Sequence, residues 1–461
     1  MRILVAALVL TCPLLSLNEA RSETLQSALA SAYSTNPTLN AARAEARSID
    51  QQVAIALSNY RPSVSADGSL GVNSTRRDVG ANSGGSASGT DTVSRSPGSV
   101  GVTVNQNLFR GFRTANATKE AEAAVQAAHY SLANTEQNTL QSAAEAYANV
   151  VRDNATVGLR KQNIQVLSEQ LRATRDRFEV GEVTRTDVAQ AEARLSASQF
   201  QLNAAESDLL TSRATFREVI GREPTRLQRP TPLMALVPPS LNDAIAIGAR
   251  EHPAILSSRF AEESASFAVR VAEGALLPTV RLEGSASYVG DIGALDSSTS
   301  TAQILGIVSI PIYQGGAEYA AIRQAKETRT QRALQVDVAR EQVRAAILSA
   351  WGGLQAARAS IQSGQAQIRA AQIALDGVRE EARVGQRTTL EVLDAQQELL
   401  DAQVSVVSAE RDVVVASYAL VSAIGRLQAK QLALNVRVYD PKVNARKTRD
   451  LWGGLRVPSG Q

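Results

Sequence analysis

The sequence predicts a mainly α-helical protein that also carries a membrane β-barrel and is built from two tandem structural repeats. Three observations support this fold class. Short motifs recur at fixed offsets, four segments alternate apolar residues with small or polar ones, and two long segments carry an apolar residue at every seventh position. A chain of 461 residues is long enough for two or three domains or for one repetitive architecture.

The internal repeat is visible as pairs of motifs. Asn36 and the proline after it correspond to His252 and its proline, 216 residues later. Gly181 corresponds to Gly385, 204 residues later, within matching Val-Gly-x-x-Thr motifs. The residues missing from the second copy fall on residues 73–97 of the first, which are rich in Gly, Ser and Thr and which we expect to form a surface loop.

These pairs divide the chain into five parts. We expect a signal peptide at 1–20, a first repeat at 21–222 with a β-hairpin at 63–107, a proline-rich linker at 223–240, a second repeat at 241–430 with a β-hairpin at 279–310, and a C-terminal tail at 431–461. Each repeat is expected to begin with one helix, at about 24–59 and 241–276, and to continue after its hairpin as two long helices.

The first 20 residues have the pattern of a secretion signal. Arg2 precedes an apolar run over residues 3–17, and a cleavage site after Ala20 fits the pattern only in part, because Asn18 interrupts the expected A-x-A motif. The only cysteine, Cys12, lies in this leader, so disulfides and cysteine metal sites are excluded from the mature chain. Beyond the leader no stretch of 18 apolar residues occurs, so the sequence predicts no transmembrane helix.

The two hairpins have the two-residue period of β-strands. Val64, Ala66 and Leu70 alternate with serine and aspartate, and residues 100–104 and 280–288 follow a similar pattern. Each chain would supply four strands, and an open four-stranded sheet cannot cross a bilayer because its edges leave backbone groups unpaired in hydrocarbon. Two chains would give a filled eight-stranded barrel and three chains an open twelve-stranded one. The small residues on the second face favour twelve strands.

Aromatic residues are scarce but lie next to the predicted strand ends. They make up 4% of the chain. The four at these positions are Tyr60, Phe109, Phe112 and Tyr313. We expect them to form an interfacial girdle, and the alternative is that they belong to an ordinary core.

Heptad patterns predict long helices that pack as coiled coils. The seven-residue spacing continues without a slip through Val188, Leu195, Leu202, Leu209 and Phe216, and again through Val392, Leu399, Val406, Val413 and Leu420. Matching heptads in both copies are specific for this packing. A run of about 67 residues, at ~1.5 Å per residue, would be roughly 100 Å long, which fits a tube or a rod.

Composition excludes several classes of function. Lys and Arg number 48 and Asp and Glu 45, and the net charge of +3 is accounted for by the last 22 residues, so nucleic-acid binding is not predicted. The two histidines, His129 and His252, have no nucleophile or metal partner in the pattern, and no glycine-rich phosphate loop follows a strand. We therefore predict no catalytic residue, no cofactor, no metal site and no enzymatic activity.

The tandem helix–hairpin–long-helix unit resembles the TolC family of outer-membrane efflux channels. Residues 180–188 (VGEVTRTDV) and 384–395 (VGQRTTLEVLDA) resemble the family's inter-helix turns. Residues 434–441 (LNVRVYDP) and 451–455 (LWGGL) resemble its C-terminal signature. The resemblance covers essentially the whole mature chain. It implies a homotrimer in the outer membrane of a Gram-negative bacterium, with a twelve-stranded β-barrel that continues into a long α-helical coiled-coil barrel in the periplasm.

The resemblance also implies the function and the partners. The trimer would be a passive exit duct that exports small toxic compounds such as drugs, detergents and bile salts. It would dock to a periplasmic adaptor, or membrane-fusion protein, and to an inner-membrane pump of the RND or ABC type. One alternative is type I protein secretion as the main role. A second, a periplasmic coiled-coil adaptor, would have neither the alternating strands nor the tail residues Tyr439, Asp440 and Pro441.

The resemblance finally assigns residues to the periplasmic tip. The expected adaptor contacts are Val180, Gly181, Thr184, Val384, Gly385 and Thr388. The two glycines could instead cap helices, and both roles can hold together.

Two further pairs at the tip are expected to control the pore. Asp187 and Arg387 would hold the tip closed, while Glu391 and Asp394 would form an acidic constriction. Carboxylates ~10 Å apart in water repel by only about 0.4 kcal/mol, so the contacts of Asp187 with Arg387 should matter more. The alternative is that these side chains are simply solvated. Where the family has a tip tyrosine this chain has Ala382, so part of the closing network is absent.

Overall fold

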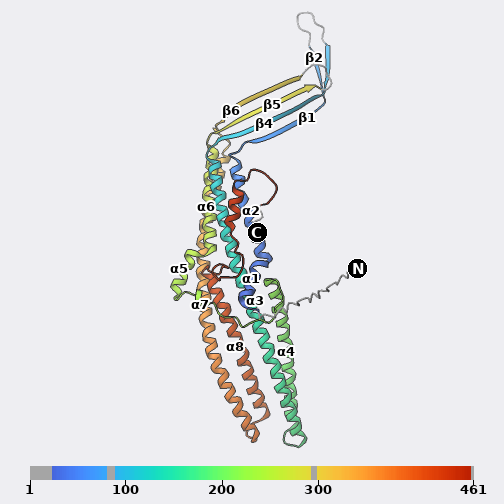
Figure 1. Cartoon of the computed structure of the whole chain (residues 1–461), viewed down its shortest axis with the longest axis vertical. Helices are drawn as coiled ribbons and strands as arrows, with labels where there is room; N and C mark the ends of the chain where they lie inside the picture. Colours follow the sequence, from blue (N-terminus) through green and yellow to red (C-terminus); the bar gives the residue numbers. More distant parts are fainter. Residues whose placement is uncertain (1–22, 80–88, 292–297, 458–461) are drawn as a thin grey trace, which may run out of the picture. The chain divides into compact units, whose positions relative to one another are not determined.

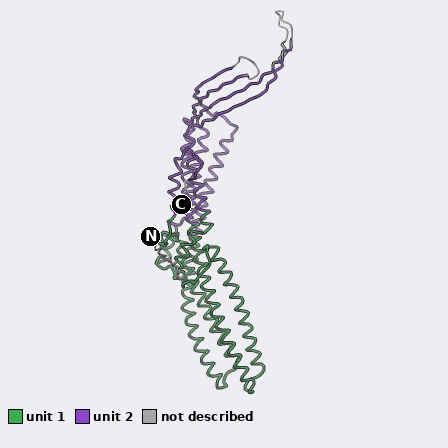
Figure 2. The backbone as a smooth tube through the Cα atoms, turned by 45° about the vertical axis from the view of Figure 1, so that its right-hand side comes forward, with its two compact units in different colours: residues 1–40, 135–248, 345–438 green, residues 41–134, 249–344, 439–461 purple. Residues whose placement is uncertain are grey.

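The computed structural model describes residues 23–79, 89–291 and 298–457. The expected signal peptide and Cys12 lie outside these residues. The chain divides into two compact units (Figure 2). Unit 1 consists of Met1–Asn40, Thr135–Gly248 and Ala345–Val438, and unit 2 consists of Ala41–Asn134, Ala249–Arg344 and Tyr439–Gln461.

The chain is mainly α-helical, as the sequence predicts. The helices are α1 (Leu25–Thr35), α2 (Pro37–Ser58), α3 (Arg113–Glu179), α4 (Arg185–Ile220), α5 (Leu241–Glu251), α6 (Pro253–Glu273), α7 (Ala317–Arg383), α8 (Thr389–Ala423) and α9 (Pro441–Arg449), with short 3-10 turns at Met234–Leu236 and Gly274–Leu276. α3 and α7 both have 67 residues. They begin 204 residues apart, the same offset as the later motif pairs. No helix in the described part of the chain combines the length and apolarity needed to cross a membrane.

The prediction of single helices at 24–59 and 241–276 was wrong, because a break divides each of these segments into two helices. The breaks lie at Asn36 and His252, immediately before Pro37 and Pro253. Proline lacks the N–H needed to continue the helical ladder but suits the first position of a new helix. The residues at the breaks cap that new helix: Asn36 Oδ1 accepts from Leu39 N at 3.1 Å, and His252 Nδ1 accepts from Ala254 N at 3.2 Å.

Unit 2 contains a four-stranded antiparallel sheet (Figure 1). Its strands are β1 (Ser63–Leu70), β4 (Pro97–Arg110), β5 (Thr279–Asp291) and β6 (Ser298–Ser309), in the order β1-β4-β5-β6. The register pairs Val64 with Val104, and Val100 with Tyr288. Apolar residues of neighbouring strands therefore share one face, because side chains alternate along each strand. The described sheet is open, with β1 and β6 as its edge strands.

The prediction of a surface loop at residues 73–97 was wrong for most of the described residues in that range. Strands β2 (Asn73–Val79) and β3 (Gly89–Arg95) pair as a separate two-stranded antiparallel sheet. Thr75 lies opposite Val93 in its register. β-branched residues such as these favour extended structure, and the glycine and serine content of the segment hid that signal.

In unit 1 the predicted heptad positions form the buried seam of the long helices. Every heptad residue of α8 is buried, and in α4 the last three are buried. Two clusters show how the helices meet near their turns. One joins Leu167 and Leu171 of α3 with Ala191 of α4 and Leu393 of α8. Apolar residues every seven positions keep the same helix face toward its neighbour over many turns, which explains the seam.

Candidate functional site

Two helix–turn–helix connections of unit 1 carry the residues that were predicted to form the tip. One joins α3 to α4 and the other joins α7 to α8 (Figure 1). Each turn contains one glycine in the left-handed region, with φ +83° at Gly181 and +78° at Gly385. The next residue donates its N–H five residues back, from Glu182 to Arg177 and from Gln386 to Glu381, both at 2.9 Å. This Schellman pattern ends a helix and favours glycine at the left-handed position.

The helix after each turn begins with a capping box. Thr184 Oγ1 accepts from Asp187 N at 3.4 Å, while Asp187 Oδ2 accepts from Thr184 N at 2.8 Å. In the second turn Thr388 and Glu391 exchange the same bonds, at 3.3 and 2.8 Å. A capping box satisfies two backbone donors that the first turn of a helix leaves unpaired. All four side chains therefore have a local structural role.

Hydrogen bonds favour the charged forms of the tip residues. The hydroxyl and N–H of Thr184 lower the pKa of Asp187, and the N–H of Thr388, followed by Arg387 and the Thr388 hydroxyl, lowers the pKa of Glu391. The carboxylates of Glu381 and Glu391 raise the pKa of Arg387. These residues stay ionised near neutral pH.

Arg387 makes its ion pairs within its own turn. Its Nε lies 2.7 Å from Glu381 Oε2, and its Nη1 lies 2.7 Å from Glu391 Oε1. The structure thus brings two of the predicted gate residues, Arg387 and Glu391, together. Within the described part of one chain it does not bring Asp187 to Arg387. The carboxylate of Asp187 is instead bonded to Thr184.

Asp394 joins two helices. Its carboxylate pairs with Arg194, so α8 and α4 are linked within about the first three turns of each helix. The predicted acidic constriction residues therefore both have a cationic partner in the same chain. Each pair is partly exposed, and such pairs contribute little to stability.

Sequence reasoning missed Arg194 and Glu381. Glu381 is six residues before Arg387, and only the tight turn brings the two side chains together. A glycine expected to adopt φ > 0 could have signalled this contact, since a Schellman turn folds the chain back on its last helical turn. Arg194 pairs across two helices 200 residues apart in sequence, and no sequence spacing predicts that contact.

The valines at the two turns are available to a partner. Val180 and Val384 are both 72% exposed. They precede the left-handed glycines Gly181 and Gly385, where a Cβ atom added to the glycine would have no neighbouring atom within 4 Å. Each turn therefore presents one apolar side chain beside open space, flanked by charged residues.

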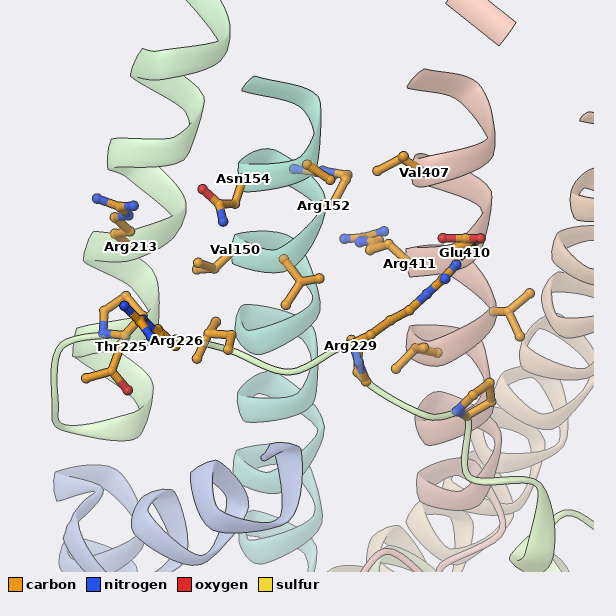
Figure 3. Close-up of a pocket in the computed structure, with 18 of the residues that line it drawn as sticks. Val150, Arg152, Asn154, Arg213, Thr225, Arg226, Arg229, Val407, Glu410 and Arg411 are labelled. Atoms are coloured by element: carbon orange, nitrogen blue, oxygen red, sulfur yellow. Dashed lines mark ion pairs between the residues drawn. The ribbon is translucent and has the colours of Figure 1, made fainter. Parts of the chain in front are cut away.

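A second feature of unit 1 is a cavity of about 820 Å³ beside the proline-rich linker (Figure 3). Five arginines line it: Arg152, Arg213, Arg226, Arg229 and Arg411. Figure 3 shows Arg213 and Arg226 toward α4 and the linker, and Glu410 and Arg411 on α8. Arg229 pairs with Glu410, whereas Arg213 and Arg226 have no carboxylate partner among the described residues. Two unbalanced guanidinium groups beside apolar walls can hold an anionic group.

The linker beside this cavity is fixed by Glu23 and Tyr147. Glu23 N donates to Arg226 O at 2.8 Å, and Gln228 N donates to Glu23 O at 3.0 Å. The Tyr147 hydroxyl lies 2.7 Å from the carbonyl oxygens of both Glu23 and Gln228. Burial raises the pKa of Tyr147 to about 12, so its hydroxyl keeps the proton that it donates.

The structure gives His129 a partner that the sequence did not suggest. In unit 2 its Nε2 lies 2.8 Å from Asp50 Oδ1, and the other oxygen of Asp50 accepts from Asn444 Nδ2 at 2.7 Å. All three residues are buried. This network holds α9 against α2 and α3, which is a structural role. In the described residues no group of three or more His, Cys, Asp or Glu is arranged to hold a metal ion.

Comparison with known sequences shows what this arrangement is similar to. The chain matches the family described as outer membrane efflux protein over residues 28–222 and 249–426. It is 45% identical over 459 residues to the outer membrane efflux protein BepC of Brucella suis biovar 1 (strain 1330), covering 99% of this chain and 97% of BepC. It is 27% identical over 331 residues to the outer membrane protein TolC of Escherichia coli (strain K12), covering 67% of this chain and 66% of TolC.

Solved structures share the fold. The Campylobacter jejuni CmeC outer membrane channel matches with a TM-score of 0.77 over 92% of this chain and 89% of that chain. The two sequences are 18% identical, so this likeness concerns the fold.

Proposed function

Because the chain belongs to the outer membrane efflux protein family, whose members include TolC, we propose that it is the outer-membrane exit duct of a three-part export system. A periplasmic adaptor and an inner-membrane pump of the RND or ABC type would deliver small toxic compounds to it. The relative named an efflux protein, 45% identical over almost the whole chain, supports efflux over protein secretion as the main role.

The open sheet is the observation that carries the proposal. Its two faces differ, and the outer edges of β1 and β6 pair with no strand in the described chain. Val64, Val100 and Ile304 on the apolar face are 57–77% exposed, which is costly for a sheet that faces water. Three copies that pair β1 of one with β6 of the next would close a twelve-stranded barrel, leave no edge and turn the apolar face to lipid.

The long helices would continue as a periplasmic tube. Residues 21–222 and 241–430 would act as two structural repeats, as the equal lengths and fixed offset of α3 and α7 suggest. The helix pairs of three copies would then alternate around the tube. The adaptor would bind the exposed turns, with Val180 and Val384 as apolar contacts and the glycines and threonines holding the turns in shape.

The gate would depend on contacts between copies. Nε and Nη1 of Arg387 are engaged within the chain, which leaves Nη2 to donate elsewhere. Asp187 is ionised and forms no ion pair with a guanidinium group among the described residues, although, after the hydrogen bonds from Thr184, the charge of nearby Arg177 helps to lower its pKa. An Asp187–Arg387 bond between neighbouring copies would satisfy both and narrow the pore, while Glu391 and Asp394 would line it with negative charge.

Single-channel conductance in planar bilayers tests the proposal. We expect the wild-type protein to form pores of low conductance and Arg387→Ser to form larger ones. Asp187→Asn, which keeps an oxygen to cap α4 but removes the charge, should behave like Arg387→Ser. A conductance that neither substitution changes would show that the gate lies at other residues. Folded protein that forms no pore would contradict the channel itself.

A further inference from the structure

The C-terminal segment formed by residues 441–457 is not used by the proposed duct. It consists of the basic helix α9 and residues 450–457, which contain Leu451, Trp452 and Leu455. We propose that this segment is an interfacial anchor that inserts Trp452 and Leu455 into the phospholipid headgroup region, beside the point where the sheet enters the membrane. The inference rests on the proposed function, because it requires the sheet to lie in a bilayer.

α9 is fixed to unit 2 by buried polar contacts. Asn444 and Thr448 are 1% and 0% exposed, on the side that faces the helices. Asn444 donates to Asp50, which also bonds His129, and Asp440 caps the start of α9 by accepting from Lys442 N at 3.0 Å. The segment is therefore held in place up to residue 449 and is not a free tail.

Arg61 then holds the residues after α9 at the foot of the sheet. Its Nη1 donates to Leu451 O at 2.9 Å, and its guanidinium lies 4.5 Å from the centre of the Trp452 ring. Arg61 is followed by Pro62 and by Ser63, the first residue of β1. Trp452 is thus tied to the end of the sheet at which β1 begins.

The side chains held there are apolar and exposed. Trp452 is 74% exposed, Leu455 is fully exposed and Val457 is 70% exposed. Tyr60 and Phe112, which flank the same end of β1 and β4, are 52% and 63% exposed. Large apolar side chains kept in water on an anchored backbone indicate a missing partner. Tryptophan and tyrosine prefer the boundary between headgroups and acyl chains, where the ring is buried and its N–H or O–H stays hydrated.

The charge of the segment identifies that partner as a phospholipid surface. Lys442, Arg446 and Lys447 are exposed and have no carboxylate partner among the described residues. Arg449 pairs with Glu122 at 3.1 Å. A cluster of basic side chains next to an exposed tryptophan complements lipid phosphates and the interface above them.

The chain provides its own probe for this proposal, because Trp351 and Trp452 are its two tryptophans. Trp351→Phe leaves Trp452 as the only one. We would reconstitute this variant in vesicles of phosphatidylethanolamine with a minor fraction of phosphatidylglycerol, containing lipid brominated either near the headgroup end or near the methyl end of the acyl chain. Quenching of Trp452 should be at least about twofold stronger with the shallow bromine, as expected for an interfacial ring.

Trp452→Phe is the matched control. It leaves Trp351, which lies in α7 and, under the proposed function, belongs to the periplasmic tube. Neither bromine should quench it. Conductance measured on the same preparations separates the two hypotheses. Pores with an unquenched Trp452 would overturn the anchor and leave the duct intact. Folded protein without pores would contradict the proposed duct. In that case the quenching of Trp452 would still show whether its ring inserts into the headgroup region.

Arg61→Ala tests whether the anchor depends on the clamp. Removing the guanidinium frees both Leu451 and Trp452, so the preference for the shallow bromine should weaken, while Arg61→Lys should retain part of it through the cation–ring contact. A third variant that replaces Lys442, Arg446 and Lys447 by glutamine should lose any gain in quenching seen on adding phosphatidylglycerol. Unchanged quenching in both the alanine and the glutamine variants would contradict the roles assigned to the clamp and the charges.

Discussion

The two turns of unit 1 that join α3 to α4 and α7 to α8 have the same backbone but opposite charge patterns. Both contain a left-handed glycine, a Schellman bond at 2.9 Å and a threonine capping box. In the first turn the arginine precedes the glycine, as Arg177 pairs with Glu182 at 3.1 Å. In the second the arginine follows it, as Arg387 pairs back to Glu381.

This difference separates what builds a turn from what a turn can do. Glycine and threonine satisfy the backbone in both turns, so exposed charges are free to differ without changing the conformation. In the second turn two carboxylates, those of Glu381 and Glu391, surround Arg387, whereas in the described first turn Asp187 bonds to its capping partner Thr184. We therefore expect the turns to respond equally to changes in the backbone residues and unequally to changes in charge.

Replacing either glycine should have the largest effect. Gly181→Ala and Gly385→Ala force a Cβ into the left-handed region, at a cost of about 1–2 kcal/mol, although open space surrounds both positions. Local opening, measured by amide hydrogen exchange of each turn, should rise about five- to thirtyfold, and by similar factors in the two variants. A large effect at one glycine alone would show that the turns are not equivalent.

Removing the threonine caps should have the next largest effect. Thr184→Ala and Thr388→Ala each lose a capping box, which is worth about 1 kcal/mol, so exchange in the first turns of α4 and α8 should rise about fivefold. Serine at the same positions retains the hydroxyl and is the control. Equal hydrogen exchange in the alanine and serine variants would contradict a stabilising role of the threonine caps.

Charge substitutions should distinguish the two turns. Arg387→Ser should enlarge single-channel conductance, whereas Arg177→Ser should leave it near the wild-type value, because of these two arginines Arg387 is the one proposed to close the pore. The change in open population should be at most about fivefold, since exposed ion pairs are weak. Equal increases in both variants would indicate general loosening of the tip and not a specific gate.

Acidification should have the smallest effect, and both turns should show it. The pKa values of Asp187 and Glu391 are lowered in the folded turns. Their carboxylates therefore stabilise the turns fully at a pH above the unfolded-state pKa of about 4. That stabilisation is lost as the pH falls through the lower pKa of the folded state. A spin label at Gln386→Cys in a Cys12→Ser background should stay immobile from neutral pH to about 5 and gain mobility below about 4. Adding Glu391→Gln should abolish that transition, and a transition near pH 6 would contradict the assignment.

Local patterns predicted much of this structure. The heptads of α4 and α8 were correctly assigned to a buried seam, because a seven-residue period keeps one face toward the neighbouring helix. The alternation in β4 and β5 correctly predicted two unlike faces. The same reasoning failed at Asn36 and His252, where a proline set a helix break, and at residues 73–95, where polar strands resembled a loop.

The candidate site was predictable only in part. Gly385 and Thr388 could be assigned to the turn because their conformations depend on neighbours a few residues away. Pairings such as Arg194 with Asp394, or His129 with Asp50, connect distant segments and required the folded chain. The family resemblance implied Asp187 and Arg387 as partners, yet within the described part of one chain each is bonded to its own turn.

The sequence alone determined the helical class, the heptad seams, the alternating strands and the turns between the long helices, because periodicity and capping act over a few residues. Tertiary structure decided which charges meet, where the linker and α9 are fixed, and that Trp452 is held exposed at the foot of the sheet by Arg61. These contacts join residues up to several hundred positions apart, and only the packing of long helices brings them within hydrogen-bonding distance.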